Sequence, residues 1–355
     1  MSWEIVGRRR ALGVGIIGCG YWGKNYVRVF NELPETKVIA ICDRSEDRLH
    51  EIARRAPGIK LTTDINEILE DEQIEAVVIC TEASSHFKVA SQCLRAGKHL
   101  LIEKPITTSV PDAAELGRLA DGSSLTLMVG HTFLYNSGIA AIESYLREEK
   151  DRIYYLHARR TNLGPIRRDV NAVRDLATHD IAIFNHLLKQ TPEWVSAVGA
   201  KVLGNCRVDV GFICLGYANG VVGHIHISWA DPNKCREVVV VCSGRRLVFN
   251  DLNAVEPVRI YEKGVSAVGG EPENFGEYQL NIRDGAIISP AVEPSEPLKN
   301  QCRHFIECIH TGERPRTDVE DGVSVLATLE AIERSIQLQG TTIKVENHEC
   351  YASAA

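Results

Sequence analysis

The chain has 355 residues, of which 44% are apolar and 25% are charged, a composition typical of a soluble globular protein with two domains. Its formal net charge of −7 argues against a nucleic-acid-binding protein, because such proteins carry a strongly basic surface. The eleven cysteines form no C-x-x-C pair and no stretch has the length of a membrane span, so we expect reduced thiols, a cytoplasmic location and no membrane partner.

The first third of the chain alternates predicted strands and helices. Strands are expected over 12–17, 37–43, 59–62, 76–80, 99–103 and 125–130, and helices over 24–33, 45–56, 65–70, 86–96 and 111–120. Small and β-branched apolar residues fill the strand at 12–17, as is typical of a buried parallel strand. The alternation predicts an α/β fold with a doubly wound parallel sheet over residues 1–131.

The pattern changes after residue 131. Helices are expected over 135–148, 174–189, 297–310 and 320–338, and strands over 153–160, 236–242, 245–249 and 257–263. Asn219 and Gly220 separate two further apolar runs, and Asn-Gly is the strongest short hairpin signal. We therefore predict that residues 132–355 form an α+β domain with a largely antiparallel open sheet, which binds substrate and mediates oligomerisation.

A glycine motif follows the first predicted strand. Residues 13–24 read GVGIIGCGYWGK, in which Gly18, Gly20 and Gly23 form G-x-G-x-x-G. The first glycine permits a tight turn, the second lets a pyrophosphate approach the backbone, and the third lets the helix pack closely on the sheet. The helix N-terminus then offers free N–H groups to the phosphates. We therefore expect a Rossmann dinucleotide-binding domain, the alternative being a glycine-rich turn without a ligand.

Asp43 lies twenty residues after Gly23, at the end of the second predicted strand. Its carboxylate would accept hydrogen bonds from the ribose hydroxyls of an adenosine and would repel a 2′-phosphate. NAD is therefore the expected cofactor, with NADP the less favoured choice. Arg44 weakens this preference because a neighbouring arginine pairs readily with a 2′-phosphate.

Several segments together resemble the Gfo/Idh/MocA family of sugar and cyclitol oxidoreductases. They are GVGIIGCGYWGKN at the glycine motif, TEASSHFKVA at 81–90, GKHLLIEKPIT at 97–107, VGHTFLYNSG at 129–138, RDLATHDIAIFNHLL at 174–188 and PLKNQCRHFIECIHTGERP at 297–315. The resemblance implies hydride transfer between a nicotinamide cofactor and a hydroxyl carbon. It also implies a C-terminal domain whose open sheet faces a partner subunit, and therefore a homodimer or homotetramer.

Lys104 is the first predicted catalytic residue. It follows a buried strand at the carboxyl edge of the sheet, where open α/β folds bind ligands. A lysine there loses solvation and donates to a developing alkoxide. Pro105 would fix the turn that holds it. The alternative is a solvated surface lysine.

Asp175 and His179 are the other predicted catalytic residues. They lie four apart on a predicted helix and would share one face. The carboxylate would orient the imidazole or share the substrate hydroxyl with it, while His179 takes or returns the proton. Asp180 would point about 100° away and receives no role. A surface helical pair is the alternative.

Further residues are expected to contact the cofactor or the substrate. Besides the glycines, Asp43 and Arg44, the expected cofactor contacts are Tyr21, Trp22, Thr81, His86, Glu103 and Lys104. The expected substrate contacts are Lys104, His131, Tyr135, Asn162, Arg167, Arg168, Asp175 and His179. The arginines suit a carboxylate or diphosphate, although a solvated charged loop explains them equally well. A structural histidine is an equal alternative for His131.

No metal site is expected. His224 and His226 alternate on one predicted strand and share a face, but no carboxylate or cysteine at suitable spacing completes a ligand set. We interpret them as sheet-face residues at a subunit interface. Phe212, Ile225, Ile227 and Trp229 are expected on an apolar face that needs a partner.

These observations predict an NAD-dependent oxidoreductase that acts on a secondary hydroxyl carbon of a sugar, cyclitol or nucleotide-sugar. Two alternatives stay open. One is an NAD-dependent glycoside hydrolase that oxidises its substrate transiently, and the other is a non-catalytic NAD-binding sensor. Net reduction of NAD would separate the dehydrogenase from the hydrolase. The acid–base residues argue against the sensor, because a binding module does not need them.

Overall fold

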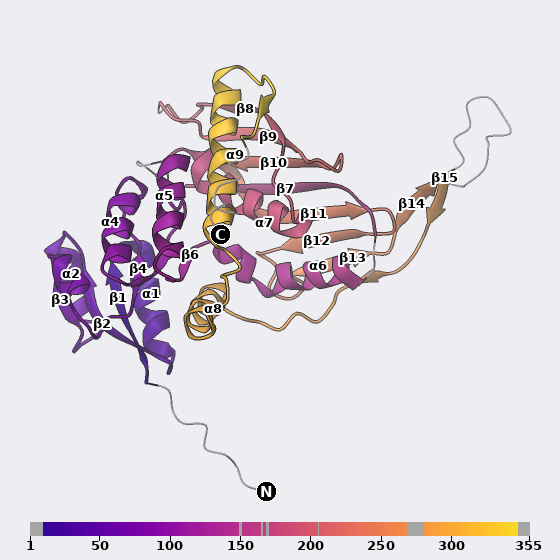
Figure 1. The fold of residues 1–355 in the computed structure, drawn as a ribbon. Helices are drawn as coiled ribbons and strands as arrows, with labels where there is room; N and C mark the ends of the chain where they lie inside the picture. Colours follow the sequence, from indigo (N-terminus) through magenta and orange to yellow (C-terminus); the bar gives the residue numbers. More distant parts are fainter. Residues whose placement is uncertain are drawn as a thin grey trace, which may run out of the picture. The chain divides into compact units, whose positions relative to one another are not determined.

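The computed structural model describes residues 10–148, 151–164, 166–167, 170–204, 206–267 and 280–346. They form two compact units (Figure 1). Unit 1 holds the described residues up to Thr132 together with Glu296–Leu326, and unit 2 holds those of Phe133–Ser295 and those from Ala327 onward. This division differs from the predicted continuous segments 1–131 and 132–355, because residues 296–326 join the first unit.

Unit 1 is built on a six-stranded parallel sheet in the order β3-β2-β1-β4-β5-β6. The strands are β1 (Leu12–Ile17), β2 (Thr36–Cys42), β3 (Lys60–Thr62), β4 (Ala76–Ile79), β5 (His99–Ile102) and β6 (Leu127–Val129). The helices between them are α1 (Tyr21–Glu32), α2 (Glu46–Ala53), α3 (Asn66–Leu69), α4 (Ala83–Arg95) and α5 (Val110–Asp121). This is the strand order of the Rossmann fold, so the predicted doubly wound sheet is confirmed.

Helix α1 begins directly after the glycine turn and packs on the sheet through Tyr26, Val27 and Phe30. Their spacing of three and four residues places them on one helical face. Helix α8 (Pro297–Thr311) contacts α1. Right-handed crossovers place α1 and α4 on opposite faces of the sheet, because the chain leaves β1 and β4 in opposite directions.

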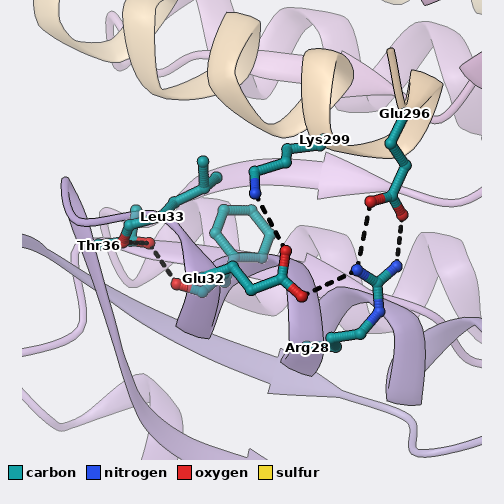
Figure 2. A network of polar contacts seen from close by, with 7 residues as sticks. Arg28, Glu32, Leu33, Thr36, Glu296 and Lys299 are labelled. Atoms are coloured by element: carbon teal, nitrogen blue, oxygen red, sulfur yellow. Dashed lines mark hydrogen bonds and ion pairs between the residues drawn. The ribbon is translucent and has the colours of Figure 1, made fainter. Parts of the chain in front are cut away.

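Figure 2 shows the polar contacts between α1 and α8. Arg28 forms a fork with the carboxylate of Glu296 and also bonds Glu32 at 3.1 Å. Lys299 of α8 donates to the other oxygen of Glu32 at 3.0 Å. These side chains are largely solvated, and such pairs contribute little stability individually. The contacts therefore align α8 on α1, while the buried apolar residues below supply the packing energy.

Unit 2 contains a nine-stranded sheet in the order β16-β13-β12-β11-β7-β10-β9-β8-β17. The strands are β7 (Ile153–Leu163), β8 (Trp194–Ala200), β9 (Val210–Gly216), β10 (Val222–Ser228), β11 (Ala230–Cys242), β12 (Arg246–Asn250), β13 (Val258–Tyr261), β16 (Ile287–Ile288) and β17 (Ile343–Lys344). Every neighbouring pair is antiparallel except β7 and β10. The predicted α+β domain with a largely antiparallel sheet is thereby confirmed. The hairpin of β14 (Gly264–Ala267) and β15 (Leu280–Arg283) projects past one edge of this sheet (Figure 1).

Helices cover one face of this sheet, which we call the inner face. They are α6 (Ser137–Glu148), α7 (Thr178–Leu188) and the second half of α9 (Val319–Gln337). Phe184 of α7 packs against Gly223 of β10. Ser335 of α9 accepts a hydrogen bond of 2.8 Å from the backbone N–H of Ala197 on β8. The core of unit 2 therefore lies between these helices and the inner face.

The opposite, outer face carries side chains that no described helix covers: Tyr155, His157, Val198, Phe212, Val222, His224 and His226. His226 pairs in register with Phe212, and their rings stack at 4.5 Å. The prediction that Ile225, Ile227 and Trp229 share the face of Phe212 is wrong, because all three are buried. The two isoleucines alternate with His224 and His226, so they point to the inner face.

The turn between β9 and β10 has the predicted Asn-Gly sequence, and Gly220 adopts a φ of +78°. The helix predicted over 174–189 is divided, since Val173–Ala177 forms one π-helical turn, η2, before α7 begins. Within the residues described by the structure, no helix is both long enough and apolar enough to cross a membrane.

Candidate functional site

The glycine turn of unit 1 is shaped by contacts that exclude side chains. Gly18 has a φ of +97°, and a Cβ there would lie 2.8 Å from the Cys80 carbonyl group. A Cβ on Gly23 would lie 1.9 Å from the carbonyl oxygen of Gly18. A Cβ on Gly20 would meet nothing within 4 Å. The first and third glycines therefore close the turn, and the second leaves open space above it.

Gly20 is the N-cap residue of α1, and the first turn of this helix holds no acidic side chain. By contrast, Ser45 caps α2 and Ser109 caps α5 with their side-chain oxygens. The first N–H groups of α1 have no acceptor within the helix, and no side chain caps them. The residues present therefore fit a dinucleotide pyrophosphate at this helix end.

Asp43 follows β2 and reaches the glycine turn. Its Oδ2 accepts from the Cys19 N–H at 2.6 Å, and its Oδ1 accepts from the Ser45 N–H at 2.8 Å. Each carboxylate oxygen accepts a second hydrogen bond, so the group keeps capacity for ribose hydroxyls. Arg44 is exposed, whereas the Arg48 guanidinium lies 3.6 Å from Asp43.

The two aromatic residues of the glycine motif differ in exposure. Tyr21 is 79% exposed at the start of α1, and its ring meets that of Trp22 edge-on at a centroid distance of 5.5 Å. The position of Tyr21 is compatible with a cofactor contact, which stays a prediction.

Lys104 follows β5 and is 8% exposed, and its peptide bond to Pro105 is cis. Its backbone N–H donates to Oε2 of Glu103 at 3.1 Å, and the hydroxyl of Tyr26 donates to Oε1 at 2.8 Å. Gln301 of α8 donates to the Tyr26 hydroxyl at 2.8 Å. Burial, followed by the charge of Glu103, raises the pKa of Tyr26 well above its usual value. The Glu103 carboxylate therefore links the backbone at Lys104 to Tyr26 of α1.

His86 and Thr81 support the same loop. The imidazole of His86 is 1% exposed, with Nδ1 2.8 Å from the Pro105 carbonyl oxygen and Nε2 3.1 Å from that of Thr81. Thr81 Oγ1 accepts a hydrogen bond from Ser85. His86 thus links the segments after β4 and β5 through backbone carbonyls, and a direct contact of His86 or Thr81 with the cofactor stays a prediction.

His131 is 2% exposed, and neither ring nitrogen has a hydrogen-bond partner among the described residues. Burial, helped by the positive charge of Lys104, lowers its pKa from 6.5 to about 4. A neutral imidazole with two unpaired buried nitrogens is costly. A ligand that supplies a donor and an acceptor would remove this cost, which favours the binding interpretation of His131 over the structural one.

In unit 2, Asp175 lies in the π-helical turn η2 and His179 in the first turn of α7. Because a π-helical turn is wider than an α-helical turn, Asp175 and His179 do not have the simple α-helical i, i+4 relation that the sequence suggests. Asp175 Oδ1 lies 3.2 Å from Nη1 of Arg167. Arg174 is bound by a fork to Glu333 of α9 with a shortest distance of 2.7 Å, which fixes the turn from its other side. Single π-helical turns are frequent at functional sites.

Of the remaining predicted substrate contacts, Asn162 and Tyr135 are among the described residues of unit 2, and Asn136 adjoins Tyr135. Asn162 donates to the Gly164 carbonyl at 2.6 Å, while its Oδ1 is buried and lacks a partner within the described part of the chain. Tyr135 is 5% exposed, in the 3₁₀-helix η1 (Thr132–Tyr135). Asn136 accepts from the Gly138 N–H and donates to Asp251, so its amide caps α6. Arg168 lies outside the described residues.

Unit 1 therefore contains the predicted cofactor residues together with Lys104 and His131, and unit 2 contains Asp175, His179, Asn162 and Arg167. Sequence reasoning missed Tyr26, which donates to Glu103, and Gln301, which donates to Tyr26. Across the described ranges, no cluster of three or more histidine, cysteine, aspartate or glutamate side chains is arranged to hold a metal ion.

Two family models match the chain. Residues 12–131 match the GFO/IDH/MocA model described as an oxidoreductase family with an NAD-binding Rossmann fold. Residues 152–248 match the GFO/IDH/MocA C-terminal domain.

The most similar proteins include two named sugar dehydrogenases. D-apiose dehydrogenase of Paraburkholderia graminis is 26% identical over 363 residues, which span 96% of this chain and 91% of that protein. UDP-N-acetylglucosamine 3-dehydrogenase of Acidithiobacillus ferrooxidans is 27% identical over 275 residues, which span 77% and 82%. The crystal structure of GenD2 from gentamicin A biosynthesis in complex with NAD has the same fold, with a TM-score of 0.80 at 22% identity and coverage of 98% and 99%.

The glycine turn gives a matched pair of variants. Gly23→Ala should lower the free energy of unfolding by about 1–3 kcal/mol or more, because its methyl group overlaps the Gly18 carbonyl oxygen. Gly20→Ala should unfold like the parent but bind NAD more weakly, because its methyl group fills the space above α1. Denaturant unfolding and NAD titration measure both effects. Parent-like NAD affinity in Gly20→Ala would contradict the assignment of that space.

The pKa of His131 predicts a pH dependence of stability. Between pH 6.5 and about 4, the unfolded chain binds a proton that the folded chain excludes, so the free energy of unfolding falls as the pH drops through this window. His131→Phe should reduce the loss between pH 7 and pH 5 by on the order of 2 kcal/mol. Denaturant unfolding at both pH values measures the change. His50→Gln, at an exposed position on α2, is the control and should leave the parent slope unchanged.

Proposed function

Because the chain belongs to the Gfo/Idh/MocA family of oxidoreductases, we propose that it is a dehydrogenase that oxidises a secondary hydroxyl carbon of a sugar, cyclitol or nucleotide-sugar. The predictions of the family, of an oxidoreductase and of NAD as cofactor are confirmed by the matches to an NAD-binding oxidoreductase family. The substrate class is supported by the two named relatives, which act on apiose and on UDP-N-acetylglucosamine.

One observation in unit 1 carries the proposal. The glycine turn follows β1 and Lys104 follows β5, so both leave the same carboxyl edge of a parallel sheet. Only β4 separates these strands, which sets them roughly 10 Å apart. When bound, NAD supplies a nicotinamide ring that accepts the hydride. The edge thus holds a phosphate-binding helix end, a buried cation and the unpaired imidazole of His131 within one short stretch of sheet.

In this mechanism Lys104 donates to the carbinol oxygen and stabilises the alkoxide. Its backbone N–H donates to Glu103, which fixes the turn from which the side chain extends, and a donor already placed at the site stabilises the charge that develops on the substrate oxygen. His131, neutral at physiological pH because of its low pKa, accepts from or donates to a neighbouring substrate hydroxyl. Both residues therefore orient the carbinol carbon for hydride transfer.

The proton is assigned to the residues of unit 2. His179 accepts it from the carbinol oxygen during oxidation and returns it during reduction. Asp175 and Arg167 form an ion pair that presents acceptors and donors to the remaining hydroxyl groups. Asn162 adds its unpaired Oδ1 as an acceptor. Charge-assisted contacts of this kind favour polyhydroxylated substrates.

We assign the outer face of unit 2 to contact with a second copy of the chain in a cytoplasmic homodimer or homotetramer. The support is that the apolar and aromatic side chains of Tyr155, Val198, Phe212 and Val222 are exposed on this one face, and exposed apolar patches mark interaction sites. Light scattering at micromolar concentration measures the oligomeric state, and the mass of one chain would refute the assignment.

The function is tested with a panel of sugars, cyclitols and nucleotide-sugars and with either NAD or NADP. A dehydrogenase forms reduced nicotinamide in proportion to the ketone produced. A hydrolase would cleave a glycoside with no net reduction, and a sensor would bind NAD without turnover. Identification of the nucleotide and sugar released on denaturing the purified protein narrows the panel.

Asp43 should set the cofactor preference. The parent should bind NAD more tightly than NADP, because the carboxylate repels a 2′-phosphate. Asp43→Ser should narrow or reverse this difference, since the exposed Arg44 then pairs with the phosphate. Direct titration of both dinucleotides measures it, and a parent that prefers NADP would refute the role of Asp43.

Lys104→Ala and His179→Ala should each lower kcat by on the order of 10²–10⁴-fold, while the Kd for NAD stays near the parent value. In this mechanism both side chains act on the carbinol oxygen, and the NAD titration tests how much the cofactor contact that is also expected of Lys104 contributes. Steady-state kinetics and NAD titration separate the two effects, with Lys37→Ala and His50→Gln as surface controls. Parent turnover in His179→Ala, or loss of NAD binding in Lys104→Ala, would overturn these roles.

A further inference from the structure

A buried ion pair lies directly beside the proposed proton carrier. Arg160 of β7 is 5% exposed and Asp180 of α7 is 1% exposed. Nε of Arg160 donates to Oδ2 of Asp180 at 3.0 Å, and Nη2 donates to Oδ1 at 2.7 Å. This two-point fork fixes both the distance and the orientation of the carboxylate. Asp180 is the residue after His179, so the fork fixes the backbone of the first turn of α7 to β7.

The ring of Phe133 lies between the Arg160 guanidinium and the His179 imidazole and contacts both. Cζ of Arg160 lies over the ring of Phe133 at 4.3 Å from its centroid. The ring of Phe133 in turn lies 4.9 Å from that of His179, tilted by 58°. A planar guanidinium stacked on an aromatic face restrains the ring. Phe133 is thereby held as a wall against the side of the imidazole.

We propose that Arg160, Asp180 and Phe133 are positioning residues for His179, which they hold by its backbone and by its ring. The proposal rests on the proposed function only for the role of His179 as proton carrier. None of the three touches the reacting atoms. They act by limiting the imidazole to the orientation in which it meets the carbinol oxygen, and a small misplacement of such a group lowers the rate strongly.

The position of Arg160 argues against a purely structural role. Leu156 and Ala158 precede it on the inner face of β7, and both are buried apolar residues. An apolar side chain at position 160 would continue this pattern, and replacing a buried ion pair by apolar residues of similar size is often neutral or stabilising for folding. Packing alone therefore does not require these two buried charges. The two hydrogen bonds between Arg160 and Asp180 do fix the orientation of the first turn of α7, which apolar contacts would not do.

The experiment uses this difference. Arg160→Met alone would leave the Asp180 carboxylate buried and unpaired, which endangers folding. The double variant Arg160→Met/Asp180→Leu removes both charges and fills their space with apolar side chains, and Phe133→Leu removes the flat ring while keeping an apolar side chain. The control is Arg245→Met/Asp151→Leu. It replaces another ion pair of unit 2, whose side chains are 8% and 17% exposed and which lies near the start of β7.

The double variant and Phe133→Leu should melt near the parent temperature, yet kcat should fall on the order of tenfold to a hundredfold. The KM for the alcohol and the Kd for NAD should stay within about twofold of the parent, because no binding group is removed. The control should keep the parent kcat. A folded double variant with the parent kcat would overturn the positioning role.

A second measurement does not depend on activity. Nuclear magnetic resonance of the histidine rings identifies the signals of His179 by their loss in His179→Ala. These signals should move or broaden in Phe133→Leu and in the double variant, and should stay unchanged in the control. If the parent oxidises no alcohol, the proposed function fails while this spectrum still tests the positioning. Unmoved His179 signals in both variants would refute it.

Discussion

The position at which α1 starts depends on the absence of a side chain at Gly23. Because that residue has no Cβ, the first turn of α1 lies against the Gly18 carbonyl, and the direction of the helix follows from this contact. The direction brings Tyr26 down to Glu103 and Gln301. The glycine turn thus also positions the segment after β5, so the predicted phosphate site and Lys104 both depend on this one backbone contact.

The two units stabilise their polar residues in different ways. Unit 1 joins neutral and charged groups into a chain from Gln301 through Tyr26 to Glu103, in which each donor has one acceptor. Unit 2 instead uses ion pairs, with Arg160 bound to Asp180 and Arg174 bound to Glu333. Buried networks of both kinds are stable only when every member is satisfied. The Oε1 of Gln301 departs from this rule, as do both ring nitrogens of His131, and it is at His131 that we expect a ligand.

Local patterns predicted most of the strands of unit 1, because continuous apolar runs bounded by turns leave little freedom in their ends. The hairpin after β9 was equally clear from Asn219-Gly220. The π-helical turn at Val173–Ala177 has no sequence signal, since the helical period continues through it. The face of Ile225 and Ile227 was wrong because facing depends on register with β9, which no single strand reveals. Arg160 was missed although its inward position after two buried apolar residues signals a buried acidic partner.

The nine-stranded sheet ends in two-residue strands on both sides, Ile287–Ile288 and Ile343–Lys344. At the edge formed by β8, the Ser335 hydroxyl also accepts a hydrogen bond from the backbone N–H of Ala197. Long unpaired edges recruit strands from other chains and lead to aggregation, so this sheet offers little template for growth into a continuous ribbon. Such protection matters because the outer face of the same sheet carries exposed apolar side chains, and an open edge and an apolar face together would promote misassembly.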